Sequence, residues 1–396
     1  MRWFLGKGGA GKTTLAAAEA LAAARAGEAV LVVSVDRAHS LGDVFGLPAG
    51  SGVRAVEDRL DVVELDSLAL LRKRYAMLAA MMALAGEHEH ADRFDLPEPE
   101  ELTGLAGVEE LLVLAEVARL ADSGKWTTVV VDAPASADAL RTLTAPRTVA
   151  DYLDRIWPQH SRVEAATGPD PRMAVVVRLF DRVLAGIAEV RDLLDDRART
   201  AAVLVAAPDR AGYAELRRLR SWLALAGIRL DSVLVNGMIP ELEGTGPAAH
   251  LLADLRAAQR AVVDEITATV TEVPVLVCER RAAEPVGLDA LGELAEVLGA
   301  DRERHGSVRV DEPVRVQHES GTGVDAVYAM RMHLPLANPA TLTLGRVDDH
   351  LVVGADGLSR RVRLASGLRR CVVSGAEFEG TDLLVRFVPD PAVWPQ

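Results

Sequence analysis

Cysteine, basic charge and long apolar runs are all scarce in this 396-residue sequence. Its two cysteines, Cys278 and Cys371, lie far apart and form no C-x-x-C pair, so the sequence indicates neither a zinc clamp nor a disulfide framework. Lys and Arg total 44 against 58 for Asp and Glu, and the net charge of -14 disfavours a sequence-independent grip on nucleic-acid phosphates. We therefore expect a protein of a reducing compartment that binds no nucleic acid.

The hydrophobic pattern of the sequence predicts neither a secretory leader nor a membrane-spanning helix. No uncharged apolar run approaches the roughly 20 residues that a bilayer-spanning helix needs. The chain begins directly in an apolar strand pattern, without a secretory leader. We expect a cytoplasmic protein with no integral membrane segment, and its length favours two domains over one.

A glycine-rich turn near the start of the chain carries the strongest functional signal. Gly6-x-x-x-x-Gly11-Lys12-Thr13 follows an apolar run and precedes a helix-forming segment from Leu15 to Arg25. In such a P-loop the backbone N–H groups converge on phosphates, the lysine reaches the outer phosphates and the threonine hydroxyl ligates Mg²⁺. The expected phosphate-binding residues are Gly8, Gly9, Ala10, Gly11, Lys12, Thr13 and Thr14.

Continuous apolar runs alternate with helical patterns through the first 298 residues. Two of these runs end in an acid, one at Asp36 and one at Asp132. Such runs predict buried parallel strands, and ligands lie at the carboxyl ends of strands in such sheets. We therefore expect an α/β fold with a doubly wound, mostly parallel sheet, and both acids beside the phosphates.

Two regions, 66–125 and 151–199, carry helical patterns that predict a helical subdomain. The first holds Met77, Met81 and Met82, which are either core residues or an adaptable apolar surface for a client helix. The segment 87–92, Glu-His-Glu-His-Ala-Asp, could be drawn as a metal site, but a solvated charge run is the favoured interpretation.

Several motifs together resemble one ATPase family. Lys7 gives the P-loop the deviant form Gly-Lys-Gly-Gly-x-Gly-Lys-Thr of the ParA, MinD, nitrogenase iron protein and ArsA/GET ATPases. The segment 34–45 resembles the first switch of the ArsA/GET family, with Arg37 in place of a proline, and 133–143 resembles its second switch. In that second switch, Ala137 and Asp138 replace the glycine and histidine of the family.

The resemblance implies an Mg²⁺-dependent ATPase that closes as a homodimer around ATP. Lys7 would reach the partner's nucleotide, as an arginine finger does, although a solvated loop lysine is the alternative. Asp36 would orient the attacking water, and its alternative role is a helix N-cap. Asp132 would hold Mg²⁺ through a water, beside Thr13.

A second set of residues resembles the adenine site of the same family. Asn236 follows a strand pattern and matches the asparagine whose carboxamide pairs with adenine, or else it is a turn residue. The run 273–279 resembles the closing strand and adenine loop, which implies that Pro274 and Val275 also contact the nucleotide.

The hydrophobic pattern of the sequence changes after residue 298. Residues 299–313 are polar and read as a linker, and short alternating runs divided by turn residues follow in 314–396. These runs predict a small antiparallel β-sandwich. It resembles the α-crystallin-like, small-heat-shock domain at the end of some bacterial ArsA-type ATPases.

The resemblance leaves the partner open. A chaperone or targeting factor for a hydrophobic or membrane-destined client is favoured by the methionine-bearing helix and the expected sandwich. A ParA-like positioning or cofactor-assembly ATPase is the alternative. The motor of an arsenite exporter is less favoured, because two separated cysteines supply no cluster of soft thiolate ligands.

Overall fold

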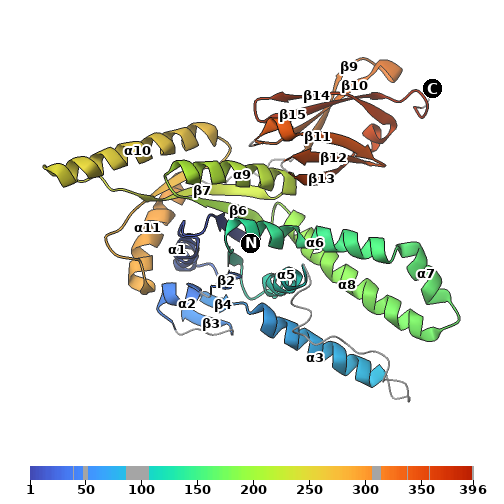
Figure 1. Ribbon diagram of the computed structural model, residues 1–396, viewed down its shortest axis with the longest axis horizontal. Helices are drawn as coiled ribbons and strands as arrows, with labels where there is room; N and C mark the ends of the chain where they lie inside the picture. The colour runs from blue at the N-terminus through green and yellow to red at the C-terminus, as the bar shows by residue number, and fades with distance from the viewer. Residues whose placement is uncertain are drawn as a thin grey trace. The chain divides into compact units, whose positions relative to one another are not determined.

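The computed structural model describes residues 1–38, 40–47, 52–85, 107–305, 314–336, 338–355 and 357–394, with the backbone alone at 77–85, 171–172 and 301–305 (Figure 1). Two compact units make up the chain: residues 1–200 with 281–305, and residues 201–280 with the C-terminal part from 306 onward. None of the helices in the described ranges is long and apolar enough to cross a bilayer.

An eight-stranded sheet has the order β3-β4-β2-β5-β1-β6-β7-β8. β2 is parallel to β4 and β5, β5 is parallel to β1, and β7 is parallel to β6 and β8, whereas β3 is antiparallel to β4. The expected α/β class with a mostly parallel sheet is confirmed. The strands are β1 Arg2–Gly6, β2 Val30–Ser34, β3 Arg54–Glu57, β4 Leu60–Glu64, β5 Thr128–Asp132, β6 Ala201–Ala206, β7 Arg229–Met238 and β8 Val275–Glu279.

Helices connect these strands in both units. The first unit contains α1 Lys12–Arg25, α2 Ser40–Phe45, α3 Ser67–Ala85, α5 Val108–Ala121, α6 Ser136–Ile156, α7 Gln159–Thr167, α8 Pro171–Asp195 and α11 Gly287–His305. The second contains α9 Arg210–Ala226 and α10 Pro247–Thr269.

The expected helical patterns are confirmed at α3, α5 and α8. Helix α11 continues to His305, so the segment expected to be a linker is helical in its first part. The possible metal segment 87–92 lies outside the described residues.

The C-terminal strands form two antiparallel sheets, as expected of a sandwich. One has the order β14-β15-β10-β9 and the other β11-β12-β13. Side chains from both sheets, among them Leu351, Val385 and Phe387, share one buried core. The strands are β9 Val314–Ser320, β10 Val327–His333, β11 Thr343–Val347, β12 His350–Ala355, β13 Leu358–Arg363, β14 Cys371–Glu379 and β15 Asp382–Pro389.

The sandwich is seated on helix α9 within the second unit. Leu225, near the end of α9, is a member of the buried core of the sandwich. Arg360 of β13 donates from Nη1 to the Ala224 carbonyl at 3.1 Å. Gly227 ends the helix with a φ of 81°, and a Cβ there would lie 3.0 Å from Arg360 Nη2. Through these contacts the sandwich and residues 201–280 form one compact unit.

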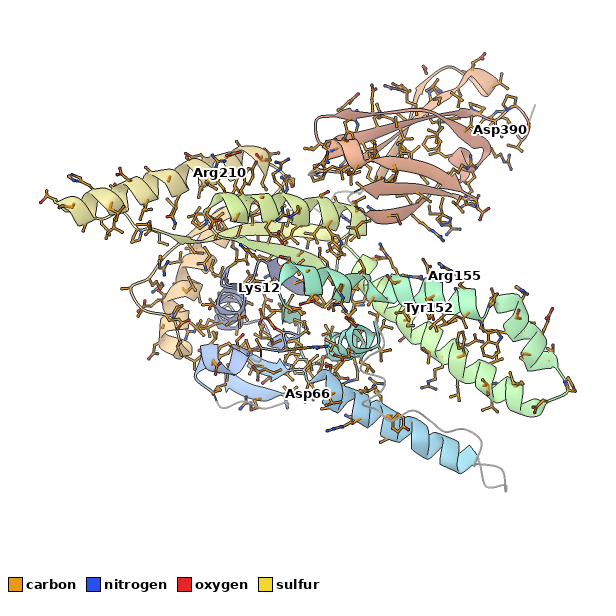
Figure 2. All side chains as sticks on the ribbon, in the orientation of Figure 1. Lys12, Asp66, Tyr152, Arg155, Arg210 and Asp390 are labelled. Atoms are coloured by element: carbon orange, nitrogen blue, oxygen red, sulfur yellow. The ribbon has the colours of Figure 1, made fainter. Side chains whose placement is uncertain are left out.

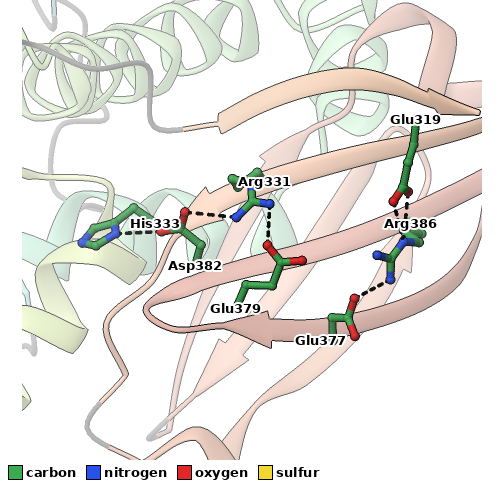
Figure 3. Close-up of polar contacts among 7 residues, drawn as sticks. All are labelled: Glu319, Arg331, His333, Glu377, Glu379, Asp382 and Arg386. Carbon is green, nitrogen blue, oxygen red and sulfur yellow. Dashed lines mark hydrogen bonds and ion pairs between the residues drawn. The ribbon is translucent and has the colours of Figure 1, made fainter.

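Exposed ion pairs cross the four-stranded sheet of the sandwich (Figure 3). Arg386 on β15 bonds to Glu377 on β14 at 2.5 Å and to Glu319 on β9 at 2.9 Å. Arg331 on β10 bonds to Glu379 on β14 at 2.6 Å. Exposed pairs contribute little energy one by one, but opposite charges on one face of the sheet, diagonal to each other or two strands apart, favour one strand register over its neighbours.

Candidate ATP site

The P-loop links β1 to α1 in the expected strand–turn–helix context. Gly9 and Gly11 have φ values of 78° and 91°, which glycine adopts without a steric penalty. Gly11 caps α1 without any side-chain hydrogen bond, and the first helical bond runs from the Leu15 N–H to the Gly11 carbonyl at 3.0 Å. The N–H groups in the first turn of α1 therefore face the turn, which makes this helix end suited to an anion such as a phosphate.

Lys12 occupies the first position of α1 and is only 6% exposed. Its Nζ lies 3.5 Å from the Lys7 carbonyl oxygen. Burial lowers the pKa of the Lys12 ammonium, while the carboxylates of Asp132 and Asp36 act in the opposite direction. A bound phosphate would supply the anionic partner that this buried cation needs.

Asp132 lies at the end of β5 and is fully buried. Ser34 Oγ donates to its Oδ2 at 3.2 Å, whereas Oδ1 has no hydrogen-bond partner within the described part of the chain. Burial is the largest cause that raises the pKa of Asp132 to about 6, and the nearby Thr13 hydroxyl and Lys12 ammonium oppose it. A buried carboxylate oxygen without a partner, beside the hydroxyl of Thr13, is a donor set that fits Mg²⁺.

The first switch lies against the P-loop. Asp36 follows β2, and its Oδ1 accepts the Ala38 N–H at 3.0 Å. Because α2 begins only at Ser40, Asp36 closes a local turn and is not a helix N-cap. Ser40 Oγ lies 3.4 Å from Thr13 Oγ1, so the start of α2 is next to the hydroxyl that fits the metal.

A buried glutamate that was not predicted from the sequence contacts this switch. Glu64 ends β4, is 4% exposed and accepts the Gly42 N–H of α2 at 3.0 Å. The strand register aligns Glu64 with Ser34 and Ser34 with Asp132, which puts three polar residues in one row at the carboxyl edge of the sheet. The signal was present, since the run Leu60–Glu64 ends in an acid as the two recognised runs do.

The second switch also approaches the P-loop. A Cβ added at Gly8 would lie 3.9 Å from the Cβ of Ala135. Helix α6 begins within this switch at Ser136, so Ala137 and Asp138 lie in the first turn of the helix. Lys7 is exposed beside this region, as are Gly8 and Gly9. The first unit thus brings Lys12, Thr13, Asp36 and Asp132 together beside the turn that carries Lys7.

The residues expected at the adenine do not all lie at one edge of the sheet. Asn236, in the second unit, is near the carboxyl end of β7 and pairs with Cys278. Val275 pairs with Val233, and the Val233 N–H donates to the Pro274 carbonyl at 3.0 Å. Pro274 and Val275 therefore lie at the amino-terminal end of β8, away from Asn236 along the strands, and their contact with adenine stays a prediction. The chain leaves β8 at the edge that holds Asn236.

Comparison with known proteins agrees with this geometry. The family model for anion-transporting ATPases matches residues 1–300. The chain belongs to the anion-transporting ATPase, or ArsA, family. A model for the HSP20-like domain found in ArsA matches residues 325–387, which confirms the expected nature of the sandwich. The protein is an ATPase and uses ATP.

Relatives within this family extend along nearly the whole chain. Protein Rv2184c of Mycobacterium tuberculosis is 42% identical, with 99% of this chain and 96% of the relative covered. Putative arsenical pump-driving ATPase 1 of Aquifex aeolicus is 25% identical over 96% of this chain and 98% of its own length. ATPase get3 of Neurospora crassa is 25% identical over 75% of this chain and 90% of its own length.

Proposed function

We propose that this ArsA-family ATPase is Mg²⁺-dependent, closes as a homodimer around ATP and uses that closure to bind and release a hydrophobic protein client. It would act as a cytoplasmic chaperone or targeting factor. The observation that carries the proposal is the course of helix α6, which begins within the second switch at Ser136 and ends in exposed apolar side chains (Figure 2). Tyr152 and Ile156, one helical turn apart near its end, are 60% and 59% exposed.

The proposed division of labour at the phosphates follows from the positions of the side chains. Lys12 offsets negative charge on the outer phosphates, and Asp36 orients the water that attacks the terminal phosphorus. Phosphoryl transfer needs positioning more than a strong base, so an ordinary ionised carboxylate suffices at Asp36. Mg²⁺, held by Thr13 and by Asp132 through a water, would supply further positive charge there. Asn236 remains the proposed reader of adenine.

The exposure of Lys7 supports the homodimer. A lysine in the phosphate turn that points into solvent is free to reach a nucleotide on a second subunit, where it would act as an arginine finger does. In a two-fold symmetric dimer each subunit would then donate one Lys7 to the other subunit's site.

An arsenite-pump role is not favoured for this chain, although relatives carry names of that kind. A metalloid site would need accessible soft thiolates. Both cysteines of the sequence are buried, Cys278 in β8 and Cys371 at the start of β14. A protein client is therefore the better-supported cargo.

A serine at Ile156 is expected to weaken client binding without affecting hydrolysis. The probe is a labelled peptide of about 20 leucine and alanine residues, the length of a bilayer-spanning helix. Loss of one exposed isoleucine contact should lower peptide affinity about 5- to 30-fold in the nucleotide state that binds it best. Fluorescence anisotropy with Mg-ATP and with Mg-ADP measures this affinity.

Leu251 provides the matched control for Ile156. It is also 59% exposed but lies on α10 in the second unit. Leu251→Ser should bind the peptide as the wild type does. Equal binding by all three proteins, or binding that ignores the nucleotide, would contradict the client proposal while leaving the ATPase assignment intact.

A further inference from the structure

Two neighbouring glutamates in the first turn of helix α5 each pair with an arginine from one of the two switch segments. Glu109, its second residue, forms an ion pair with Arg37, which directly follows Asp36 in the first switch. Ser67, the first residue of α3, donates from Oγ to the same carboxylate at 3.0 Å. One carboxylate therefore joins the first switch to the beginnings of two helices.

The adjacent residue makes the corresponding contact with the second switch segment. Arg141 Nη2 donates to Glu110 Oε1 at 3.1 Å. Arg141 lies on α6, whose first residue comes four positions after Asp132 at the end of β5. The two neighbouring glutamates thus receive one arginine from each of the segments that flank the phosphate site.

Helix α5 is placed to carry movement from these contacts into the helical part of the first unit. It packs against α3, α6 and α8 (Figure 1). Arg74 Nη2 of α3 lies 3.6 Å from Glu116 Oε2 of α5. This ion pair joins the two helices further along, in addition to the contact between Ser67 and Glu109. The dipole of α5 favours negative charge in its first turn, where both glutamates lie.

We propose that Glu109 and Glu110 are positioning residues that couple both switches to helices α3 and α5. When a nucleotide shifts Asp36 or the start of α6, Arg37 or Arg141 moves with it, and the paired carboxylate transmits the shift to the first turn of α5. Because Ser67 shares the Glu109 carboxylate, the beginning of α3 follows. The proposal rests on the nucleotide-driven switches of the proposed function, but it requires no client.

Hydrogen exchange at the start of α3 tests this coupling in the full chain. In the wild type, exchange in residues 67–76 should differ between the nucleotide-free and Mg-ATP states. Arg141→Gln and Glu110→Gln should each reduce that difference at least two-fold and lower kcat about two- to five-fold, with an unchanged KM for ATP. The double variant should be no worse than either single variant, because the two side chains act as one unit.

Arg218→Gln is the matched control. Arg218 is 64% exposed against 66% for Arg141, and it pairs with Glu215 along helix α9. It should leave both exchange and kcat unchanged. The coupling is contradicted if hydrogen exchange in residues 67–76 of the wild type is the same with and without Mg-ATP. It is also contradicted if the Arg141 and Glu110 variants keep the wild-type difference in exchange, or if the effects of the two single variants add up in the double variant. None of these results would bear on peptide binding by the Ile156 variant, so the two proposals fail separately.

Discussion

Replacement of Asp36 by asparagine is expected to lower kcat for ATP hydrolysis about 10²- to 10⁴-fold. In the wild type, Asp36 Oδ1 accepts the Ala38 N–H at 3.0 Å. Asparagine keeps a side-chain oxygen that can accept the same hydrogen bond, so the local turn should persist. The negative charge that polarises the attacking water is lost. Phosphate release measures kcat, and calorimetry with Mg-ATP should give a Kd within about three-fold of the wild-type value.

Asp264→Asn is the control for Asp36, since Asp264 is an exposed acid on helix α10 of the second unit. It should hydrolyse ATP at nearly the wild-type rate. Undiminished turnover by Asp36→Asn would remove Asp36 from the mechanism, and loss of nucleotide binding would show that the residue shapes the site and does not orient the water.

Asp132→Asn is expected to abolish Mg²⁺-dependent hydrolysis and yet stabilise the nucleotide-free protein above pH 6. The folded state raises the pKa of Asp132 from 3.8 to about 6, so it disfavours the ionised carboxylate. The stability that the protonated form contributes is fully present below about pH 4 and is lost as the pH rises through about 6. Removing the titration should gain on the order of 3 kcal/mol at neutral pH.

Urea unfolding of the nucleotide-free proteins at about pH 5 and about pH 8 measures this effect. The difference in free energy of unfolding between variant and wild type should be larger at the higher pH. The order should reverse when Mg-ATP is present, because only the wild type gains the bound cation. A variant that is less stable than the wild type at about pH 8 without nucleotide would contradict the burial argument.

The sequence predicted those parts of the fold and site that depend on local pattern. Continuous apolar runs that end in Asp36 and Asp132 identified buried strands and the edge at which they meet. The hairpin β3–β4 was not predicted, because β3 has only four residues and Asp61 interrupts the apolar run of β4.

Contacts between distant segments could not be read from the sequence. The pairs that join Arg37 to Glu109 and Arg141 to Glu110 connect residues 72 and 31 positions apart. The resemblance identified a strand near Pro274, but it did not show at which end of that strand Pro274 and Val275 lie. The docking of the sandwich on α9 was missed because Leu225 reads as an ordinary core leucine of an amphipathic helix.

Mixing two inactive variants tests the closing of a dimer around ATP most directly. Lys7→Ala lacks the lysine that a subunit gives to its partner, and Asp36→Asn lacks the acid that it uses in its own site. In a mixed dimer, one of the two sites has both groups intact. Equal amounts of the variants should therefore recover about one quarter of wild-type activity, because half of the dimers are mixed. Activity no higher than that of the separate variants would contradict a Lys7 that acts across the dimer.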